Sequence, residues 1–283
     1  MSLLPPDGPL VPADWLAERL HHPDLVVLDA GVGAHRGAAR RIPGARAFDL
    51  DGALSDHDGP LPHTMPGPDD LTRELRALGL HDRSTVVVYD GEGLYSAARA
   101  WWMLRAAGFD RAAVLDGGLP AWTAAGLPCE PEAPAAAAPE PGTFTARPRP
   151  GYLVDRAAVE AALADDGTAV LDARSRERYA GQVEEPRPGL RRGHMPGAVN
   201  LPFTDLRADG RMRSADELRA LFAAAAGPRR RLVFSCGSGV TACVLALGAE
   251  LAGYRDLAVY DGSWSEWGLP SDLPVETGVA VAG

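Results

Sequence analysis

The segment LVFSCGSGVTACVLALGAELAG (residues 232–253) joins a short apolar run to a longer run rich in alanine and leucine through a glycine-bearing loop. The first run is typical of a buried strand, and the last is typical of a helix that ends at Gly253. Cys236 therefore lies at the carboxyl end of a predicted strand, in a loop that enters a helix N-terminus. Gly237 and Gly239 allow this loop to turn its backbone N–H groups inward, which favours an anion at the cysteine sulfur. We interpret Cys236 as a nucleophile, although free cysteines are commonly buried for packing alone.

The chain contains a second copy of this pattern. A strand, a glycine-bearing loop and a helix are also predicted in VVVYDGEGLYSAARAWWMLRAAG (86–108), where Asp90 takes the place of the cysteine. Three further pairs of segments match in the same order: VLDA (27–30) with VLDA (170–173), RIPGA (41–45) with HMPGA (194–198), and GFDRAAVLDGGLPAW (108–122) with GYRDLAVYDGSWSEW (253–267). A repeat this long indicates a domain duplication. Only the second copy carries the nucleophile.

Short apolar strands alternate with helical stretches in each copy, which predicts an α/β fold with mainly parallel sheets flanked by helices. In such sheets ligands bind at the carboxyl ends of the strands, where the Cys236 loop lies. We expect an N-terminal domain at 1–128, a linker rich in proline and alanine at 129–150, and a C-terminal catalytic domain at 151–283. The second copy also holds an insert within RERYAGQVEEPRPGLRRG (176–193).

The composition restricts the possible functions. At 283 residues the chain is long enough for two domains, and no apolar run approaches the length that spans a bilayer. The net charge of −10 argues against nucleic acid or a membrane surface as partner. The scattered cysteines suggest neither disulfides nor a zinc site, and with no secretory signal pattern they favour a cytoplasmic protein without metal or cofactor. Because all 28 basic residues are arginine, a P-loop lysine and a Schiff-base lysine are excluded.

Several motifs resemble those of the tandem-domain rhodanese family of sulfurtransferases. They are CGSGVTA (236–242), GLYSAARAWWMLRAAG (93–108), LDGGLPAW (115–122), GHMPGAVNLPF (193–203) and YDGSWSEWG (260–268). The resemblance covers nearly the whole chain and implies two rhodanese-like domains. Members of the family that use thiosulfate typically carry charged residues after the cysteine, whereas those that use 3-mercaptopyruvate carry glycine and serine. Gly237 and Ser238 place the chain with the second group.

The resemblance also implies roles for individual residues. Cys236 would form a persulfide whose outer sulfur is cradled by the backbone N–H groups of the loop, at Gly237, Gly239, Val240 and Thr241. Arg178 and Arg187, both in the insert, would bind the substrate's carboxylate and carbonyl. A proton relay would use Ser238, His63 and Asp51, with His57 as the alternative histidine, and Arg99 would be either a minor substrate contact or a structural ion pair.

The implied reaction moves sulfur from 3-mercaptopyruvate, an α-keto thiol acid, through the Cys236 persulfide to a thiol such as thioredoxin or a small thiol, or to cyanide, and releases pyruvate. The alternatives are thiosulfate sulfurtransferase activity and a non-catalytic sulfur-carrier or regulatory rhodanese module. A cysteine phosphatase is disfavoured, because that chemistry needs an arginine where Ala242 stands. Roles without function also remain open for four of these residues. Arg178 and Arg187 could be solvated loop residues, His63 a surface residue and Asp51 a turn residue.

Overall fold

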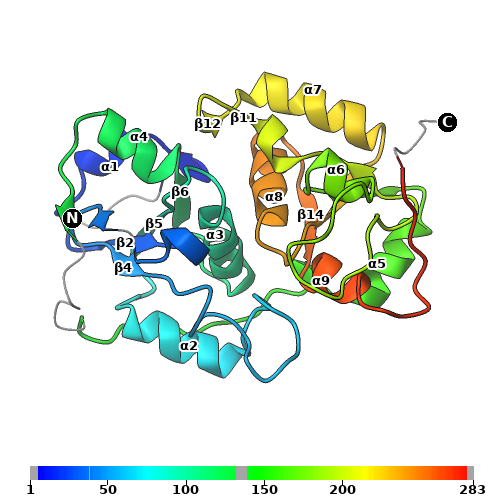
Figure 1. Ribbon diagram of the computed structural model, residues 1–283. Coiled ribbons are helices and arrows are strands. Elements are labelled where there is room, and N and C mark those ends of the chain that lie inside the picture. Colours follow the sequence, from blue (N-terminus) through cyan, green and yellow to red (C-terminus); the bar gives the residue numbers. More distant parts are fainter. Residues whose placement is uncertain (1–5, 38, 132–138, 279–283) are drawn as a thin grey trace. The chain divides into compact units, whose positions relative to one another are not determined.

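The computed structural model describes residues 6–37, 39–131 and 139–278, and the chain divides into two compact units (Figure 1). The first unit holds the chain up to His57, together with Met65–Pro150 and Asp209–Met212. The second unit holds Asp58–Thr64, Gly151–Ala208 and the chain from Arg213 onward. Each unit therefore includes a short segment that lies, in sequence, within the other.

Among the described residues, the first unit has a five-stranded parallel sheet in the order β1-β6-β5-β2-β4. Its strands are β1 (Leu10–Val11), β2 (Leu25–Asp29), β4 (Arg46–Ala47), β5 (Thr85–Tyr89) and β6 (Ala112–Leu115). Its helices are α1 (Ala13–Ala17), the 3-10 helix η1 (Gly33–His35), α2 (Pro68–Ala77), α3 (Ala97–Ala106) and α4 (Gly118–Ala124). A small antiparallel pair joins β3 (Arg40–Arg41) to β7 (Glu130–Pro131). Every residue of β5 is buried, as expected for a central strand covered on both faces.

The second unit repeats this architecture, with its described strands in the order β10-β9-β13-β14-β8, again all parallel. These strands are β8 (Leu153–Val154), β9 (Thr168–Asp172), β10 (Val199–Asn200), β13 (Arg231–Ser235) and β14 (Asp256–Tyr260). The helices are α5 (Arg156–Leu163), α6 (Arg176–Tyr179), the 3-10 helix η2 (Phe203–Leu206), α7 (Ala215–Ala226), α8 (Ala242–Leu251) and α9 (Ser263–Trp267). The short strands β11 (Arg207–Ala208) and β12 (Arg211–Met212) pair with each other.

Helices cover both faces of the second sheet. Val233 of β13 packs in one core cluster with residues of α5 and α9. Its neighbour Phe234 meets Phe222 of α7 edge-on, with ring centroids 6.4 Å apart. Because successive strand residues point to opposite faces, α5 and α9 lie on one face and α7 on the other. The fold class predicted from the sequence, a tandem pair of parallel α/β domains, is confirmed.

The duplication extends to the hydrogen bonds that hold each loop. In the first unit the backbone N–H of Leu119 donates to the carbonyl of Asp90 at 2.9 Å, and in the second the N–H of Trp264 donates to that of Cys236 at 3.0 Å. The residues just before these donors, Gly118 and Ser263, share a left-handed backbone with φ of 53° and 48°. A left-handed backbone is strained for serine, which has a Cβ atom. Because the buried Ser263 takes the same conformation as Gly118, the backbone follows the same path at this turn in both units.

The segment assigned from the sequence as a linker, 129–150, is described except for residues 132–138. Its last part is counted with the first unit. There the N–H of Gly142 donates to the carbonyl of Arg76 at 2.8 Å, and the buried ring of Phe144 meets Phe109 edge-on. This part of the segment therefore packs on the first unit, and the domain limits at 128 and 151 stay predictions.

The Asp90 loop folds around its own carboxylate. The backbone N–H groups that donate to this carboxylate, at 2.7–3.0 Å, belong to Glu92, Gly93, Tyr95, Ser96 and Ala97. Asp90 is buried, so these groups replace the water that would otherwise solvate it. A loop of this type is thus an anion cradle, and in the first unit the anion belongs to the chain itself.

Replacing Asp90 with asparagine should destabilise the first unit. An amide group presents N–H donors toward part of the cradle, and hydrogen bonds to charged groups contribute about 1.5–3 kcal/mol each. We expect Asp90→Asn to lower the free energy of unfolding by at least about 2 kcal/mol, measured by urea denaturation. Asp70→Asn, on the surface of α2, is the control and should leave the unfolding curve unchanged. Equal stability of Asp90→Asn and wild type would contradict this description of the loop.

Candidate active site

Cys236 follows directly after β13 and lies in the loop that leads into α8. Its side chain is buried, with 2% of the residue exposed. The Cys236 backbone is held on both sides, because its N–H donates to Ser263 Oγ at 3.1 Å and its carbonyl accepts the N–H of Trp264. The Ser263 hydroxyl in turn donates to the carbonyl of Tyr260 at 2.8 Å. The loop position is therefore fixed by the start of α9.

Gly237 is the point at which several groups of the site meet. Its carbonyl accepts both the backbone N–H of Ser265, at 2.8 Å, and the Ser265 hydroxyl, at 2.7 Å. A Cβ atom placed on Gly237 would lie 3.0 Å from Nη2 of Arg178. The guanidinium of Arg178 thus lies against the backbone next to Cys236, in space that a larger residue at position 237 would enter.

Arg187 reaches the same region from the other part of the insert. Its Nη1 donates to Ser265 Oγ at 3.1 Å, and this is the hydroxyl that donates to Gly237. The structure therefore places both arginines singled out in the sequence beside the residue that follows Cys236. The sequence gave no sign of Ser265 as the connection, because it lies 78 residues away from Arg187.

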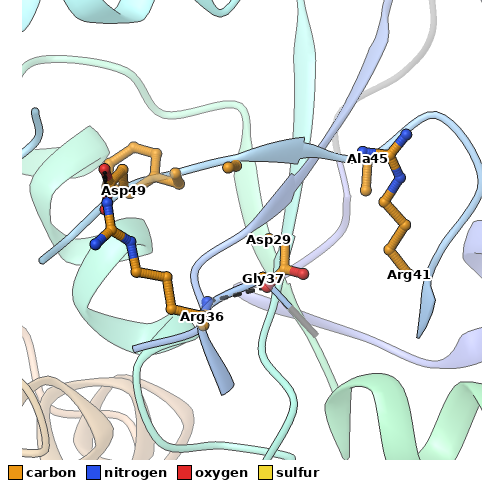
Figure 2. A pocket seen from close by; sticks show the side chains of 9 residues that line it. Asp29, Arg36, Gly37, Arg41, Ala45 and Asp49 are labelled. Carbon is orange, nitrogen blue, oxygen red and sulfur yellow. Dashed lines mark hydrogen bonds and ion pairs between the residues drawn. The ribbon is translucent and has the colours of Figure 1, made fainter. Parts of the chain in front are cut away.

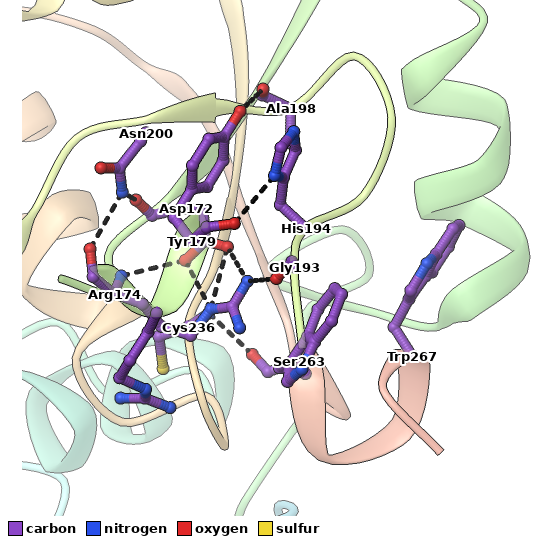
Figure 3. A network of polar contacts seen from close by, with 12 residues as sticks. Asp172, Arg174, Tyr179, Gly193, His194, Ala198, Asn200, Cys236, Ser263 and Trp267 are labelled. Carbon is purple, nitrogen blue, oxygen red and sulfur yellow. Dashed lines mark hydrogen bonds and ion pairs between the residues drawn. The ribbon is translucent and has the colours of Figure 1, made fainter. Parts of the chain in front are cut away.

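A buried ionic network surrounds Arg174 (Figure 3). Arg174 has no exposed side-chain surface and donates to Asp172, to Glu185 and to the carbonyl of Gly193. Its guanidinium also lies over the ring of Trp264, 4.1 Å from the centroid. Burial lowers the pKa of Arg174, but the charges and hydrogen bonds of Asp172 and Glu185 outweigh it and raise the pKa overall. Arg174 is therefore a structural cation, and with Glu185 it is a site component that the sequence analysis missed.

Ser238 and His63 are brought together. Nδ1 of His63 and Oγ of Ser238 are 2.9 Å apart, within hydrogen-bonding distance, and the donor depends on the histidine tautomer. The loop that carries His63 is counted with the second unit. The backbone of His63 is left-handed, with φ of 61°, which is costly for a residue with a side chain. The alternative histidine, His57, lies with Nε2 2.8 Å from the carbonyl of Gly52.

The remaining candidate residues are divided between the two units. Asp51 lies in the first unit, where its Oδ2 accepts the N–H of Gly33 at 2.8 Å. Arg99 lies on α3 with its side chain fully buried.

In the Cys236 loop, Gly239 has a left-handed φ of 76°, and Val240 and Thr241 are buried. Thr241 precedes the first residue of α8. Cys243 is buried on α8 and its Sγ donates to the carbonyl of Gly239.

A separate cavity of about 230 Å³ lies in the first unit (Figure 2). Asp29, Gly31, Arg36 and Asp49 are among its lining residues. The repeat explains its position, because the residue after VLDA is Arg174 in the second unit and Gly31 in the first. The first unit thus lacks a side chain where the second carries a buried guanidinium. No cysteine lines this cavity, so it is not a second copy of the Cys236 site.

Neither a cluster of metal-ligating side chains nor a membrane-spanning helix occurs among the described residues. No group of three or more histidine, cysteine, aspartate or glutamate side chains is arranged there to hold a metal ion. In the same part of the chain, none of the helices has the length and apolar character needed to cross a membrane.

Known proteins resemble this chain in sequence over nearly its whole length. The family model of the rhodanese-like domain matches residues 12–125 and 155–269. The chain is 41% identical over 276 residues to 3-mercaptopyruvate sulfurtransferase of Escherichia coli K12, covering 94% of this chain and 97% of that protein. It is 38% identical over 297 residues to thiosulfate/3-mercaptopyruvate sulfurtransferase 1, mitochondrial, of Arabidopsis thaliana, covering 95% and 78%.

A solved structure extends the likeness to three dimensions. The crystal structure of SseA from Escherichia coli, described as a 3-mercaptopyruvate sulfotransferase with the rhodanese fold, superposes with a TM-score of 0.80 at 37% identity. The match covers 92% of this chain and 100% of that one. Both units match the family model, and the relatives align along nearly the whole chain. The chain belongs to the tandem-domain rhodanese family of sulfurtransferases.

Proposed function

We propose that this sulfurtransferase takes sulfur from 3-mercaptopyruvate, holds it as a persulfide on Cys236 and passes it to a thiol or to cyanide. The observation that carries the proposal is the position of Arg178 and Arg187, which both approach Gly237 beside the nucleophile. Guanidinium groups bind carboxylates and carbonyls by charge-assisted hydrogen bonds. An α-keto acid held by its carboxylate end places its thiol toward Cys236.

In the first half-reaction, the Cys236 thiolate attacks the sulfur of 3-mercaptopyruvate. A bond forms between the two sulfur atoms, the carbon–sulfur bond breaks, and its electron pair passes to the pyruvate enolate. The proton from the substrate thiol moves to the enolate carbon, which gives pyruvate and leaves the persulfide ionised. The loop is suited to hold this anion, because the corresponding loop of the first unit holds the Asp90 carboxylate by its backbone N–H groups.

In the second half-reaction, the acceptor attacks the outer sulfur of the persulfide. The sulfur–sulfur bond breaks, its electron pair returns to Cys236 as thiolate, and the acceptor leaves as a persulfide or, for cyanide, as thiocyanate. Ser238 and His63, within hydrogen-bonding distance of each other, provide a route for the proton in the first half-reaction. The proposal also keeps the other expectations from the sequence. These are the roles of Asp51 and Arg99, a thiol acceptor such as thioredoxin or a small thiol, and a cytoplasmic location.

Thiosulfate is the second candidate donor, since the Arabidopsis relative is named for both donors. Thiosulfate is a compact dianion and is best served by positive charge on the loop itself. Positions 237 and 238 hold glycine and serine, and the positive charge near Gly237 comes from the insert. This distribution favours a donor with its carboxylate at some distance from the sulfur.

The nucleophile is tested first. Cys236→Ser should abolish sulfur transfer from 3-mercaptopyruvate to cyanide or a thiol, because a serine hydroxyl forms no persulfide. After treatment of the wild type with donor alone, mass spectrometry should find one added sulfur atom on the peptide that contains Cys236. Cys129→Ser serves as the control and should keep full activity. Added sulfur on Cys129 or Cys243 instead would disprove the assignment.

The donor is tested through the two arginines. Loss of a charge-assisted hydrogen bond costs about 1.5–3 kcal/mol, so Arg178→Ala and Arg187→Ala should each lower kcat/KM for 3-mercaptopyruvate about 10- to 150-fold. Arg176→Ala is the matched control, because Arg176 lies on the same short helix as Arg178 but its side chain is 67% exposed and pairs with Asp205. Full activity of both variants, or a wild-type preference for thiosulfate, would refute this choice of donor.

The Ser238–His63 pair is tested by Ser238→Ala. If the pair moves the proton, kcat for 3-mercaptopyruvate should fall by roughly 10²-fold or more, with His63→Ala giving a similar loss and the double variant little further loss. His57→Ala should be close to wild type. Steady-state rates of the four variants decide the matter, and a His57→Ala loss larger than that of His63→Ala would reverse the assignment of the histidine.

A further inference from the structure

Glu185 lies between two guanidinium groups in the insert of the second unit. Its Oε1 accepts Nη1 of Arg174 at 2.9 Å and Nε of Arg178 at 3.3 Å, and its Oε2 accepts Nη2 of Arg178 at 2.5 Å. The Glu185 side chain is 2% exposed, whereas that of Arg178 is 26% exposed. One buried carboxylate thus joins a fully buried arginine to the partly exposed arginine that lies against Gly237.

The Arg174 end of this connection is rigid. Besides Glu185, Arg174 donates to both carboxylate oxygens of Asp172 and to the carbonyl of Gly193, and it lies over Trp264. All of these partners belong to the second unit. Since Arg174 is fixed by so many contacts, Glu185 is fixed as well, and Arg178 receives a defined anchor.

The Arg178 end is arranged for a ligand. Glu185 engages Nε and Nη2 side by side, which sets both the position and the plane of the guanidinium. Among the described residues, Nη1 of Arg178 has no hydrogen-bond partner, so its two N–H groups remain available. Arg174 is also paired with Asp172, so the two arginines and the two carboxylates balance in charge, and the N–H groups of Nη1 are what Arg178 offers to an incoming carboxylate.

We propose that Glu185 is a positioning residue for sulfur transfer: it holds the Arg178 guanidinium beside the Cys236 loop, and Arg174 holds Glu185. The inference rests on the proposed function, since it assigns Arg178 the carboxylate of the donor. Without Glu185, Arg178 would lose its anchor and regain the rotamer freedom of a long exposed side chain. The substrate would then have to order this arginine when it binds.

The test is Glu185→Gln, which keeps the size of the side chain and removes its charge. In the amide an NH2 group takes the place of one carboxylate oxygen, so either the Nη2 contact of Arg178 at Oε2 or the shared contact of both arginines at Oε1 is lost, and the charge is lost in either case. We expect kcat/KM for 3-mercaptopyruvate to fall roughly 10- to 100-fold, mainly through a higher KM, because the carboxylate contact is made before and during the reaction alike. Persulfide formation on Cys236 from inorganic polysulfide, which has no carboxylate, should keep the wild-type rate.

The matched control is Glu184→Gln, one residue earlier in the same insert. The side chain of Glu184 is 79% exposed and pairs with Arg192, so its kinetics should equal those of the wild type. In the Arg178→Ala background, Glu185→Gln should change kcat/KM less than twofold, because the residue through which it acts is absent. Glu185→Asp is the second variant if the glutamine variant is poorly folded. It keeps the charge beside Arg174 and withdraws it from Arg178, and it should raise KM in the same way.

A folded Glu185→Gln or Glu185→Asp variant with wild-type KM would overturn the inference, since it would show a purely structural role. An equal loss in the Arg178→Ala background would also overturn it. Failure of the proposed function gives a different result, in which wild type, Glu184→Gln and Glu185→Gln are alike inactive with 3-mercaptopyruvate.

Discussion

Hydrogen bonds from the start of α9 fix the loop on which the chemistry depends. The N–H groups of Trp264 and Ser265 donate to the carbonyls of Cys236 and Gly237, and the hydroxyl of Ser263 accepts the N–H of Cys236. These bonds engage the carbonyls of the first two loop residues, so the path of the loop after β13 is set by α9. The left-handed backbone of Ser263 is the cost of this arrangement.

The two units share one backbone fold but carry different side chains at corresponding positions. Both have the parallel sheet, the loop and the carbonyl contact from the following helix. The first unit carries Asp90 and Gly31 where the second carries Cys236 and Arg174. The second also carries the insert, whose arginines are anchored by Glu185 and Ser265. The proposed site thus consists of a few side chains added to a fold that both units share, as is general for folds that serve several functions.

Much of this could be predicted from the sequence. The internal repeat predicted two similar folds, and the position of the cysteine between an apolar run and a helical run predicted a loop at the carboxyl end of a strand. The insert indicated where the arginines are, but not what they touch, because the path of an irregular loop is set by tertiary contacts. The role of Glu185 depends on a buried arginine eleven residues before it. Which histidine lies beside Ser238 likewise depends on a backbone turn that residue spacing does not reveal.

The carboxylate of Asp90 has a consequence for what the first unit can bind. It is tethered to the backbone of the loop that surrounds it, so its effective concentration at the cradle is far higher than that of any dissolved anion. Sulfate, phosphate or thiosulfate in solution cannot compete with a ligand that never diffuses away. The loop of the first unit therefore stays occupied by the Asp90 carboxylate. This loop keeps the folded shape that an anion gives, independent of any dissolved ligand, whereas the corresponding loop of the second unit carries Cys236 and no carboxylate in its sequence.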